Sequence, residues 1–320
     1  MSTGEPQNKK EKLLVLLGPT ASGKTQLSIE LAKELHTEII SGDSMLVYRG
    51  FDIGSAKPSA AEMSGIRHHM IDILPPAASF NLMDFLQQVK ALITRLNQEH
   101  KIPVLAGGTG LYIQSLLEGY ELNRQCGDEA YRQKLERLAE EKGRVFVHQM
   151  LSEVNPQAAK RLHPNDFRRI IRALEVYHLG GEHISRQRAP ELVYDAYVAG
   201  LMWQRSALYG RINQRVELMM KQGLTQEIRS LLAAGVPADC QAMKGIGYKE
   251  LLPALTETFS SEAIAQAAAK IQQNSRHFAK RQLTWYRRMP YIHWYQPELY
   301  TDLQQLKQNL LWDIQRWLNR

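Results

Sequence analysis

The stretch LLVLLGPTASGKT, residues 13–25, decides the fold class of this chain. Its first five residues form an unbroken apolar run, as expected for a strand that is buried on both faces of a parallel sheet. The next eight match the pattern G-x-x-x-x-G-K-[ST], and residues 24–35 continue as a helix with a leucine at every fourth position. A strand, a glycine-rich turn and a helix in this order predict a loop that binds a diphosphate or triphosphate.

Each part of this loop suits an anion for a physical reason. Glycines let the backbone fold around the ligand, and N–H groups at the helix N-terminus supply positive partial charge. Lys24 adds a full charge, and Thr25 offers a hydroxyl to Mg²⁺. The predicted diphosphate-binding residues are Gly18, Pro19, Thr20, Ala21, Ser22, Gly23, Lys24 and Thr25.

Strands and helices alternate after the loop. Residues 38–41, 70–74 (MIDIL) and 102–106 have the composition of strands, and residues 81–97 have that of a helix. Such alternation predicts a parallel sheet with right-handed crossovers, flanked by helices, which places the chain in the α/β class.

The pattern becomes helical from about residue 115. Helices are predicted at 128–142, 145–151, 155–161, 166–179, 206–221, 224–234, 243–256, 261–288 and 298–319, and strands at 197–203 and 291–295. On the helix 261–288, the expected apolar row is Ile264, Ala268, Ile271, Phe278 and Trp285. We therefore expect a P-loop α/β domain of residues 11–114 and 196–320, interrupted by a helical insertion domain of residues 115–195.

The 320 residues carry 40 Lys or Arg against 33 Asp or Glu, a net charge of +7. Residues 160–188 hold seven basic and three acidic side chains, and residues 270–288 hold six basic and no acidic ones. Two concentrated basic segments indicate a polyanionic partner such as a nucleic acid. The hydrophobic fraction of 44% excludes a disordered chain.

Cysteine content and the apolar runs set the expected compartment. Cys126 and Cys240 are too few for a disulfide framework or a zinc site. The polar, lysine-rich start is unlike a signal peptide, and no run approaches the roughly 18 apolar residues of a membrane span. We expect a cytoplasmic monomer without a membrane segment.

Two further segments follow predicted strands at the same edge of the sheet. Asp43, between Gly42 and Ser44, lies where ligands bind in open α/β sheets. It is a candidate general base or metal ligand, with a turn or cap residue as the alternative. The strand 102–106 ends in AGGTG, without the acidic residue that usually holds Mg²⁺ in nucleoside triphosphatases. Thr109 in this loop is a candidate for hydrogen bonding to a ligand.

Several motifs together resemble those of the tRNA dimethylallyltransferases, also called tRNA isopentenyltransferases. In chain order they are GPTASGKT, SGDSMLVYRGFDIGSAKP, AGGTGLY, HPNDFRRIIRALE, RINQRVELM, GIGYKE and AKRQLTWYR, from Gly18 to about Arg287. The resemblance implies transfer of a dimethylallyl group from dimethylallyl diphosphate to N6 of adenosine 37, in tRNAs that read codons beginning with U. The loop would then hold a prenyl diphosphate.

The resemblance also implies roles for individual residues. Asp43 corresponds to the base that accepts the proton of the adenine amine, and Arg215 to an arginine that stabilises the leaving diphosphate together with Mg²⁺ at Thr25, with Asp43 as a further candidate ligand. Thr109 corresponds to a residue that positions the adenine and the leaving group. The implied tRNA contacts are Asp43, Ser44, Met45, Leu46, Thr109, Arg132, Arg168, Arg169, Arg172, Lys244, Tyr248, Arg276 and Lys280.

Two alternatives remain open from the residues alone. A P-loop kinase for a small molecule or nucleoside would have the same loop, sheet and helical lid, and would bind ATP without needing two basic helices. The other alternative is an RNA-binding ATPase that has no enzymatic role in RNA modification. A prenyltransferase should ignore ATP and bind tRNA with a steep salt dependence.

Overall fold

A computed structural model describes residues 10–120, 128–180, 191–258 and 260–320 of the chain. It divides into two compact units, one made of Met1–Glu118 and Glu191–Arg320 and the other of Gly119–Pro190. Helix α4 (Gly110–Leu117) ends just inside the first unit. The expected positions Cys126, Arg186 and Arg188 lie outside the described residues.

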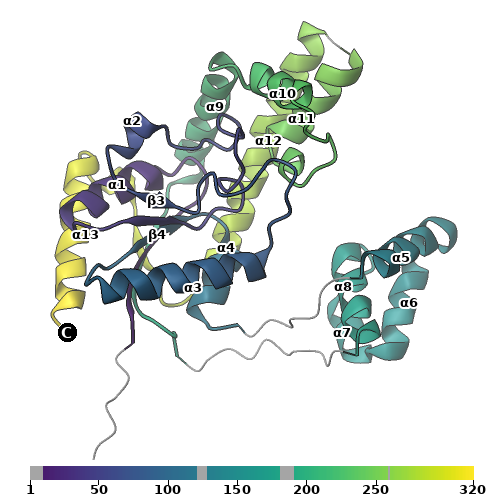
Figure 1. Cartoon of the computed structure of the whole chain (residues 1–320), viewed down its shortest axis with the longest axis horizontal. Helices are drawn as coiled ribbons and strands as arrows, with labels where there is room; N and C mark the ends of the chain where they lie inside the picture. The colour runs from purple at the N-terminus through teal and green to yellow at the C-terminus, as the bar shows by residue number, and fades with distance from the viewer. Residues whose placement is uncertain (1–9, 121–127, 181–190, 259) are drawn as a thin grey trace, which may run out of the picture. The chain divides into compact units, whose positions relative to one another are not determined.

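The first unit contains a sheet whose described strands are all parallel, in the order β3-β2-β4-β1-β5-β6. Figure 1 labels β3 and β4 of this sheet. The strands are β1 (Lys12–Leu17), β2 (Ile39–Ser41), β3 (His68–His69), β4 (Val104–Gly107), β5 (Asp195–Leu201) and β6 (His293–Tyr295). This confirms the predicted α/β class with a parallel sheet flanked by helices.

The register brings three strand ends to one edge. Leu17 of β1 pairs with Gly107 of β4, and Ser41 of β2 pairs with Ala106. The phosphate loop, the segment after β2 and the loop after β4 therefore all begin at the carboxyl edge of the sheet, as the sequence predicts.

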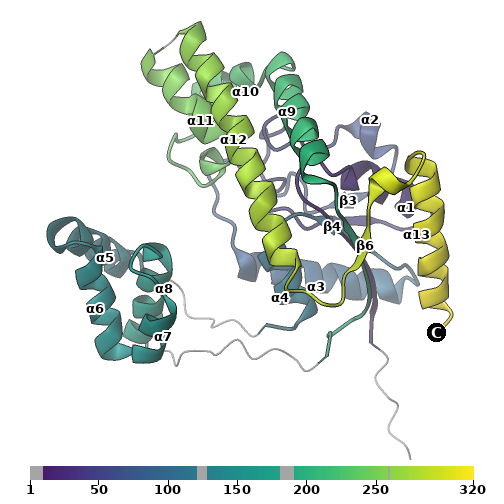
Figure 2. The same cartoon turned by 180° about the vertical axis from the view of Figure 1, so that it is seen from behind.

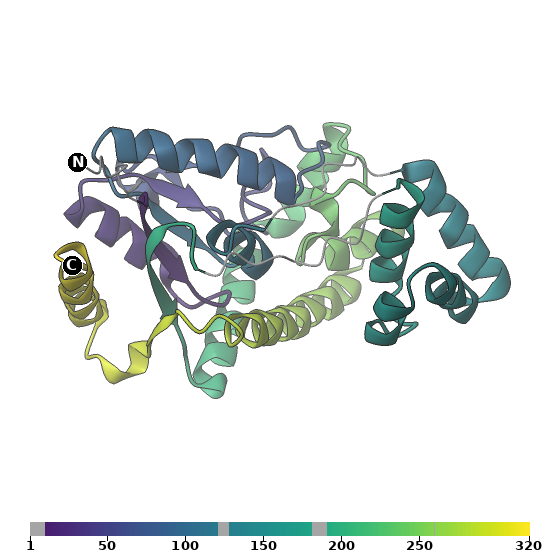
Figure 3. The same cartoon turned by 90° about the horizontal axis from the view of Figure 1, so that it is seen from below.

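Helices cover both faces of the sheet. On one face, α1 (Lys24–Glu34) packs beside β1, and α13 (Leu303–Leu318) packs beside α1 and β5. Leu27, Leu31 and Leu310 belong to one buried cluster with Leu14 and Leu16. On the opposite face lie α3 (Leu82–Gln98) and α4 (Figure 3). Burial on both sides explains why β1 reads as a continuous apolar run.

A group of C-terminal helices borders the carboxyl edge. It consists of α9 (Arg205–Lys221), α10 (Leu224–Ala233), η1 (Ala242–Lys244), α11 (Tyr248–Pro253), η2 (Ala254–Thr258) and α12 (Ser261–Tyr286). Helices α9 and α12 lie side by side in both views (Figures 1 and 2). A short helix α2 (Ala60–Met63) precedes β3, and η3 (Pro297–Leu299) follows β6. None of the helices in the described part of the chain is long and apolar enough to cross a membrane.

The second unit has a core of its own. Its described helices are α5 (Glu129–Lys142), α6 (Arg144–Val154), α7 (Pro156–Arg161) and α8 (Phe167–His178), each within a few residues of the predicted helix. Leu135, Leu151, Ile170 and Leu174 are buried together in this core. The basic side chains of α8 are consequently placed on its outer face.

The strand predicted at residues 70–74 is wrong. Met70 has a φ of 64° and Asp72 a φ of 54°, a left-handed conformation that does not continue a strand. The Asp72 and Leu74 N–H groups donate instead to carbonyls of Leu46 and Val47. The segment therefore pairs with the wall of the pocket described below, and β3 is limited to His68–His69.

Two helix predictions need correction as well. The predicted helix 243–256 is interrupted at Gly247, whose φ is 102°. On α12 only Ile271 of the expected apolar row is buried. The buried residues of this helix are Ala267, Ile271, Ala279, Gln282 and Tyr286. Gln282 is buried although it is polar, so a search for apolar residues at helical spacing does not find it.

Candidate active site

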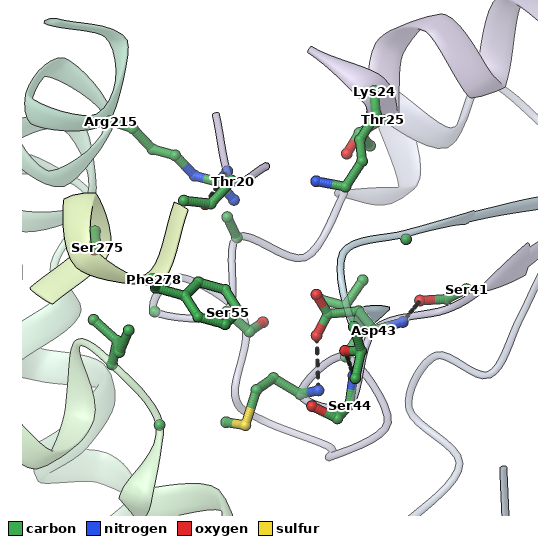
Figure 4. A pocket seen from close by; sticks show the side chains of 18 of the residues that line it. Thr20, Lys24, Thr25, Ser41, Asp43, Ser44, Ser55, Arg215, Ser275 and Phe278 are labelled. Carbon is green, nitrogen blue, oxygen red and sulfur yellow. Dashed lines mark hydrogen bonds between the residues drawn. The ribbon is translucent and has the colours of Figure 1, made fainter. Parts of the chain in front are cut away.

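A pocket of about 380 Å³ opens at the carboxyl edge of the sheet. The phosphate loop, the segment after β2, the loop after β4 and helices α9 and α12 all contribute to its lining. Figure 4 shows Lys24, Thr25 and Arg215 on one side of the pocket and Asp43 and Ser44 on the other. The chemistry predicted from separate segments is thus brought into one cavity.

The phosphate loop has the conformation of an anion-binding turn. Ala21 has a φ of 62° and Gly23 a φ of 91°, and Gly23 is the N-cap of α1. The loop is tight, because a Cβ on Gly18 would lie 2.5 Å from Ser22 Oγ. Lys24 Nζ donates to the carbonyl of Pro19 over 3.2 Å.

Side chains of α9 and of the segment before it hold the phosphate loop in place. Arg215 Nη1 donates to Thr20 Oγ1 over 3.2 Å, and Arg211 Nε donates to the Ala21 carbonyl over 2.8 Å. Trp203 Nε1 donates to the Ser22 carbonyl, with the Arg211 guanidinium above the Trp203 ring. Sequence reasoning missed Arg211, although it lies one helical turn before Arg215 and so shares its face.

Two cations face the pocket together. Burial of Lys24, followed by the charge of Arg215, lowers the pKa of the Lys24 ammonium to about 8, and the Asp43 carboxylate opposes this shift. Burial also lowers the pKa of Arg215, again opposed by Asp43. Mutually repelling, poorly solvated cations gain most from an anionic ligand, so this side of the pocket fits a diphosphate.

Asp43 lies two residues after the end of β2 and lines the pocket. Its Oδ1 accepts the Met45 N–H over 2.8 Å, and its own N–H donates to Ser41 Oγ over 3.3 Å (Figure 4). The side chain therefore closes a local turn and at the same time presents a carboxylate to the pocket. Met45 and Leu46 line the pocket beside it.

Thr109 lies next to this carboxylate segment. The Ser44 N–H donates to Thr109 Oγ1 over 3.2 Å, and the Thr109 N–H donates to the Gly42 carbonyl over 3.3 Å. Gly107 allows the two segments to approach, because a Cβ there would lie 2.6 Å from the Gly42 backbone. Thr109 is thereby fixed as a neighbour of Asp43.

Thr25 and Asp43 are the side chains that could hold a divalent cation. In the described ranges, no group of three or more His, Cys, Asp or Glu could hold a metal by itself. Mg²⁺, however, commonly takes one or two protein oxygens together with phosphate oxygens and water. The exposed Thr25 hydroxyl and the Asp43 carboxylate, on one pocket wall each, fit that mode with a bound diphosphate.

The resemblance assigned Tyr248 to the tRNA contacts, but the structure places this residue in the core of the first unit. It is fully buried, its hydroxyl donates to Glu227 over 2.7 Å, and its ring packs on Phe51. The same Glu227 carboxylate accepts the N–H groups of residues 52–54. Because its polar atom is already bound inside the core, Tyr248 supports the loop 51–57 and is withdrawn from a tRNA surface.

The other predicted tRNA contacts differ in their exposure and in whether their side chains already bind other residues. Arg168, Arg169, Lys244 and Lys280 are exposed, and Lys244 borders the pocket. Arg276 donates to Asn213 over 2.6 Å. Within the helical unit, Arg132 and Arg172 both bind the buried carboxylate of Glu175, so part of their hydrogen-bonding capacity is used.

Comparison with known proteins finds relatives over nearly the whole chain. A family model described as IPP transferase matches residues 46–289. A tRNA dimethylallyltransferase of Bacillus cytotoxicus is 49% identical over 292 residues, which cover 90% of this chain and 91% of that protein.

Two solved structures share the fold. The full-length tRNA isopentenylpyrophosphate transferase of Bacillus halodurans is 39% identical, with a TM-score of 0.70, and the match covers 97% of this chain and 99% of that one. A eukaryotic dimethylallyltransferase acting on tRNA is 27% identical, with a TM-score of 0.75, over 89% of this chain and 74% of that one.

Proposed function

The chain belongs to the IPP transferase family and transfers a dimethylallyl group to tRNA, and we propose that the donor is dimethylallyl diphosphate and the acceptor N6 of adenosine 37. The substrates would be tRNAs that read codons beginning with U. A small-molecule or nucleoside kinase is not favoured, because the similar proteins are tRNA dimethylallyltransferases.

One observation carries the proposed chemistry: a pair of cations and a carboxylate line the same pocket from different sides. Lys24 and Arg215 belong to the phosphate loop and α9, whereas Asp43 belongs to the segment after β2. A transfer from a diphosphate to an amine needs both, since negative charge develops on the leaving group while the nucleophile loses a proton.

The proposed reaction forms a bond between N6 and C1 of the dimethylallyl group and breaks the bond from C1 to the diphosphate oxygen. Lys24, Arg215 and the N–H groups at the start of α1 stabilise the departing diphosphate. Asp43 accepts the N6 proton, and Thr109 fixes the segment that carries Asp43. An adenine amine is a weak nucleophile, so removal of its proton matters for the rate.

Mg²⁺ is the proposed cofactor, held by the Thr25 hydroxyl with the Asp43 carboxylate as a second candidate. When bound, it neutralises charge on the diphosphate oxygens. Lys24 and Arg215 would add their own positive charges to the same diphosphate.

Access to N6 requires the adenine to leave its stack, which costs least in a single-stranded loop. Ser44, Met45 and Leu46 would contact the extruded base. For the anticodon arm we propose phosphate contacts by Arg168, Arg169 and Arg172 with Arg132 in the helical insertion, and by Lys244, Arg276 and Lys280. A monomer acting on cytoplasmic tRNA completes the proposal.

The test is incubation of the full chain with tRNA, Mg²⁺ and dimethylallyl diphosphate, followed by digestion and mass spectrometry of the nucleosides. We expect dimethylallyl adenosine from position 37, and ATP should neither replace the donor nor compete with it. Absence of the modified nucleoside would overturn the assignment of donor and acceptor.

The role of Asp43 is tested by Asp43→Asn, with Asp239→Asn at an exposed site as the matched control. Loss of the proton acceptor should lower the single-turnover rate about 100-fold or more while tRNA affinity changes little. A large loss of tRNA affinity with an unchanged rate at saturation would instead mean that Asp43 only shapes the pocket.

A further inference from the structure

Gln282 of α12 bridges two loops of the active site. It is buried, its Oε1 accepts the Thr20 N–H over 2.9 Å, and its Nε2 donates to the Gly108 carbonyl over 2.8 Å. One side chain thus bonds at the same time to the phosphate loop and to the loop after β4. Burying an amide is costly unless it is bonded in this way.

Tyr286, one helical turn later, strengthens the same link. Its hydroxyl donates to the Gly108 carbonyl over 2.8 Å and lies 3.4 Å from the Gly18 carbonyl oxygen. The contact is close, because a Cβ on Gly108 would lie 2.6 Å from Gln282 Nε2. Helix α12 therefore fixes the spacing of these loops through hydrogen bonds and through direct packing.

One of the two loops contacts the residues proposed to bind the diphosphate, and the other contacts the segment that carries Asp43. On one side, Thr20 accepts the hydrogen bond from Arg215, in the half that would receive the diphosphate. On the other, Gly108 precedes Thr109, whose hydroxyl holds Ser44 beside Asp43. Gln282 stands between the cationic half and the carboxylate half of the pocket.

We propose that Gln282 is a positioning residue that sets the distance between the leaving diphosphate and the Asp43 carboxylate. The inference rests on the proposed function. A misplacement of about 1 Å between reacting groups can lower a rate about 100-fold without weakening substrate binding. The Thr20 N–H is already bonded to Gln282, so it is not among the groups that would grip the anion.

This arrangement predicts a split between binding and chemistry. Arg211 and Trp203 hold the phosphate loop independently of Gln282, through the carbonyls of Ala21 and Ser22. Removing Gln282 should therefore leave the anion site formed but free to shift relative to Asp43.

The experiment uses Gln282→Met in the full chain, because methionine has a similar length and lacks both hydrogen bonds. Gln266→Met, at an exposed position of the same helix, is the matched control. We measure the single-turnover rate with both substrates saturating, the Kd for inorganic diphosphate and the Kd for tRNA. The expected result is a rate about 10- to 100-fold lower, both Kd values within about threefold of the wild type, and an unaffected control.

Two outcomes would overturn the inference. One is an unchanged single-turnover rate, and the other is a diphosphate Kd that rises by the same factor as the rate falls. If Gln282→Met does not fold, Tyr286→Phe removes one donor from Gly108 and should give the same split with a smaller rate loss; equal rates in that variant would also overturn it. An inactive wild type, in contrast, contradicts the proposed function itself.

Discussion

The Ser44 N–H donates to Thr109 Oγ1 over 3.2 Å, which couples the segment that carries Asp43 to the N-cap of α4. The hydroxyl of Thr109 therefore accepts from another segment and makes no capping bond within its own helix. A residue at this position is required to offer an acceptor while remaining small enough for the close approach at Gly107.

Thr109→Val keeps the shape of the side chain and removes that acceptor. We expect the single-turnover rate to fall about tenfold because Asp43 loses its lateral support, and the free energy of unfolding to fall by about 1 kcal/mol because the Ser44 N–H loses its partner. Thr109→Ser restores the hydroxyl and should recover most of both quantities. A Val variant as active as the Ser variant would show that the hydrogen bond has no part in positioning.

Diphosphate binding should depend on pH through Lys24. Burial and Arg215 lower the pKa of its ammonium to about 8, so the side chain is charged below that pH and becomes neutral above it. The affinity of the free enzyme for inorganic diphosphate should consequently fall as the pH rises through about 8. Arginine keeps its charge throughout this range, so Lys24→Arg lacks this titration.

The measurement is the diphosphate Kd of both proteins between about pH 6 and pH 10. The ligand itself gains charge in this range, and the ratio of the two Kd values removes that common effect. We expect the ratio of wild-type to Lys24→Arg Kd to rise above pH 8. A ratio that stays constant would contradict a titrating Lys24.

Tyr248 is expected to contribute to stability and to leave tRNA binding alone. Tyr248→Phe keeps the packing on Phe51 and removes the hydrogen bond to Glu227, which should cost about 1 kcal/mol in urea unfolding. Glu227→Ala leaves the N–H groups of residues 52–54 without their acceptor and should cost more. If the Tyr248→Phe protein has normal stability but reduced tRNA affinity, Tyr248 takes part in tRNA binding and the purely structural role is wrong.

Arg168 and Arg169 are the basic residues of α8 that are most available to phosphates. Both are exposed, whereas Arg172 is bound to Glu175. The double variant to alanine should weaken tRNA binding and reduce the slope of log Kd against log salt by about 1 to 2. Diphosphate affinity should not change, because the phosphate loop belongs to the other unit.

Arg137→Ala, an exposed position on α5 of the same unit, is the matched control for these arginines. It should leave both the tRNA Kd and its salt slope close to the wild type. If the control weakens binding as much as the double variant does, the effect reflects total charge, and the proposed contact at α8 is wrong.

The parts of the site that the sequence predicted are those encoded by contiguous residues. The phosphate loop needs only residues 18–25 in sequence, and Asp43 and Thr109 follow strand ends that meet at one edge of a parallel sheet. Local chemistry was sufficient for the phosphate loop, and the general rule that parallel strands end at one edge of the sheet was sufficient for Asp43 and Thr109.

The supporting residues could not be predicted because their partners are remote in sequence. Gln282 binds Thr20 and Gly108, which are more than 170 residues away. Because its side chain is polar, a search for apolar residues at helical spacing does not identify it as a buried position of α12. In the sequence, Glu227 has no feature that distinguishes it from other acidic residues on helices. Its role depends on the N–H groups of residues 52 and 53, which donate to its carboxylate. The segment 70–74 failed as a strand because left-handed residues within it are set by pairing with the loop 46–48.

The carboxylate of Glu175 organises two of the arginines that the sequence assigned to tRNA. The Glu175 side chain is fully buried. Its carboxylate accepts a hydrogen bond from Arg132 Nε over 2.6 Å, forms an ion pair with Arg172 and accepts the Asp128 N–H over 2.8 Å. Burial raises the pKa of this carboxyl, but the hydrogen bonds from Arg132 and Arg172 lower it by more than burial raises it. The pKa of Glu175 therefore lies below the usual 4.5. The charged form is therefore favoured in the folded unit.

Glu175→Gln should destabilise the helical unit by about 2 kcal/mol, because the amide keeps the shape but loses the charge that both arginines bind. Since the folded pKa lies below the unfolded one, this stabilisation is present above about pH 4.5 and is lost as the pH falls through the folded pKa. Urea unfolding followed at neutral and acidic pH should show a difference between wild type and variant that shrinks as the pH falls below 4.5. A difference that is constant with pH would mean that packing, and not the charge of Glu175, accounts for the loss.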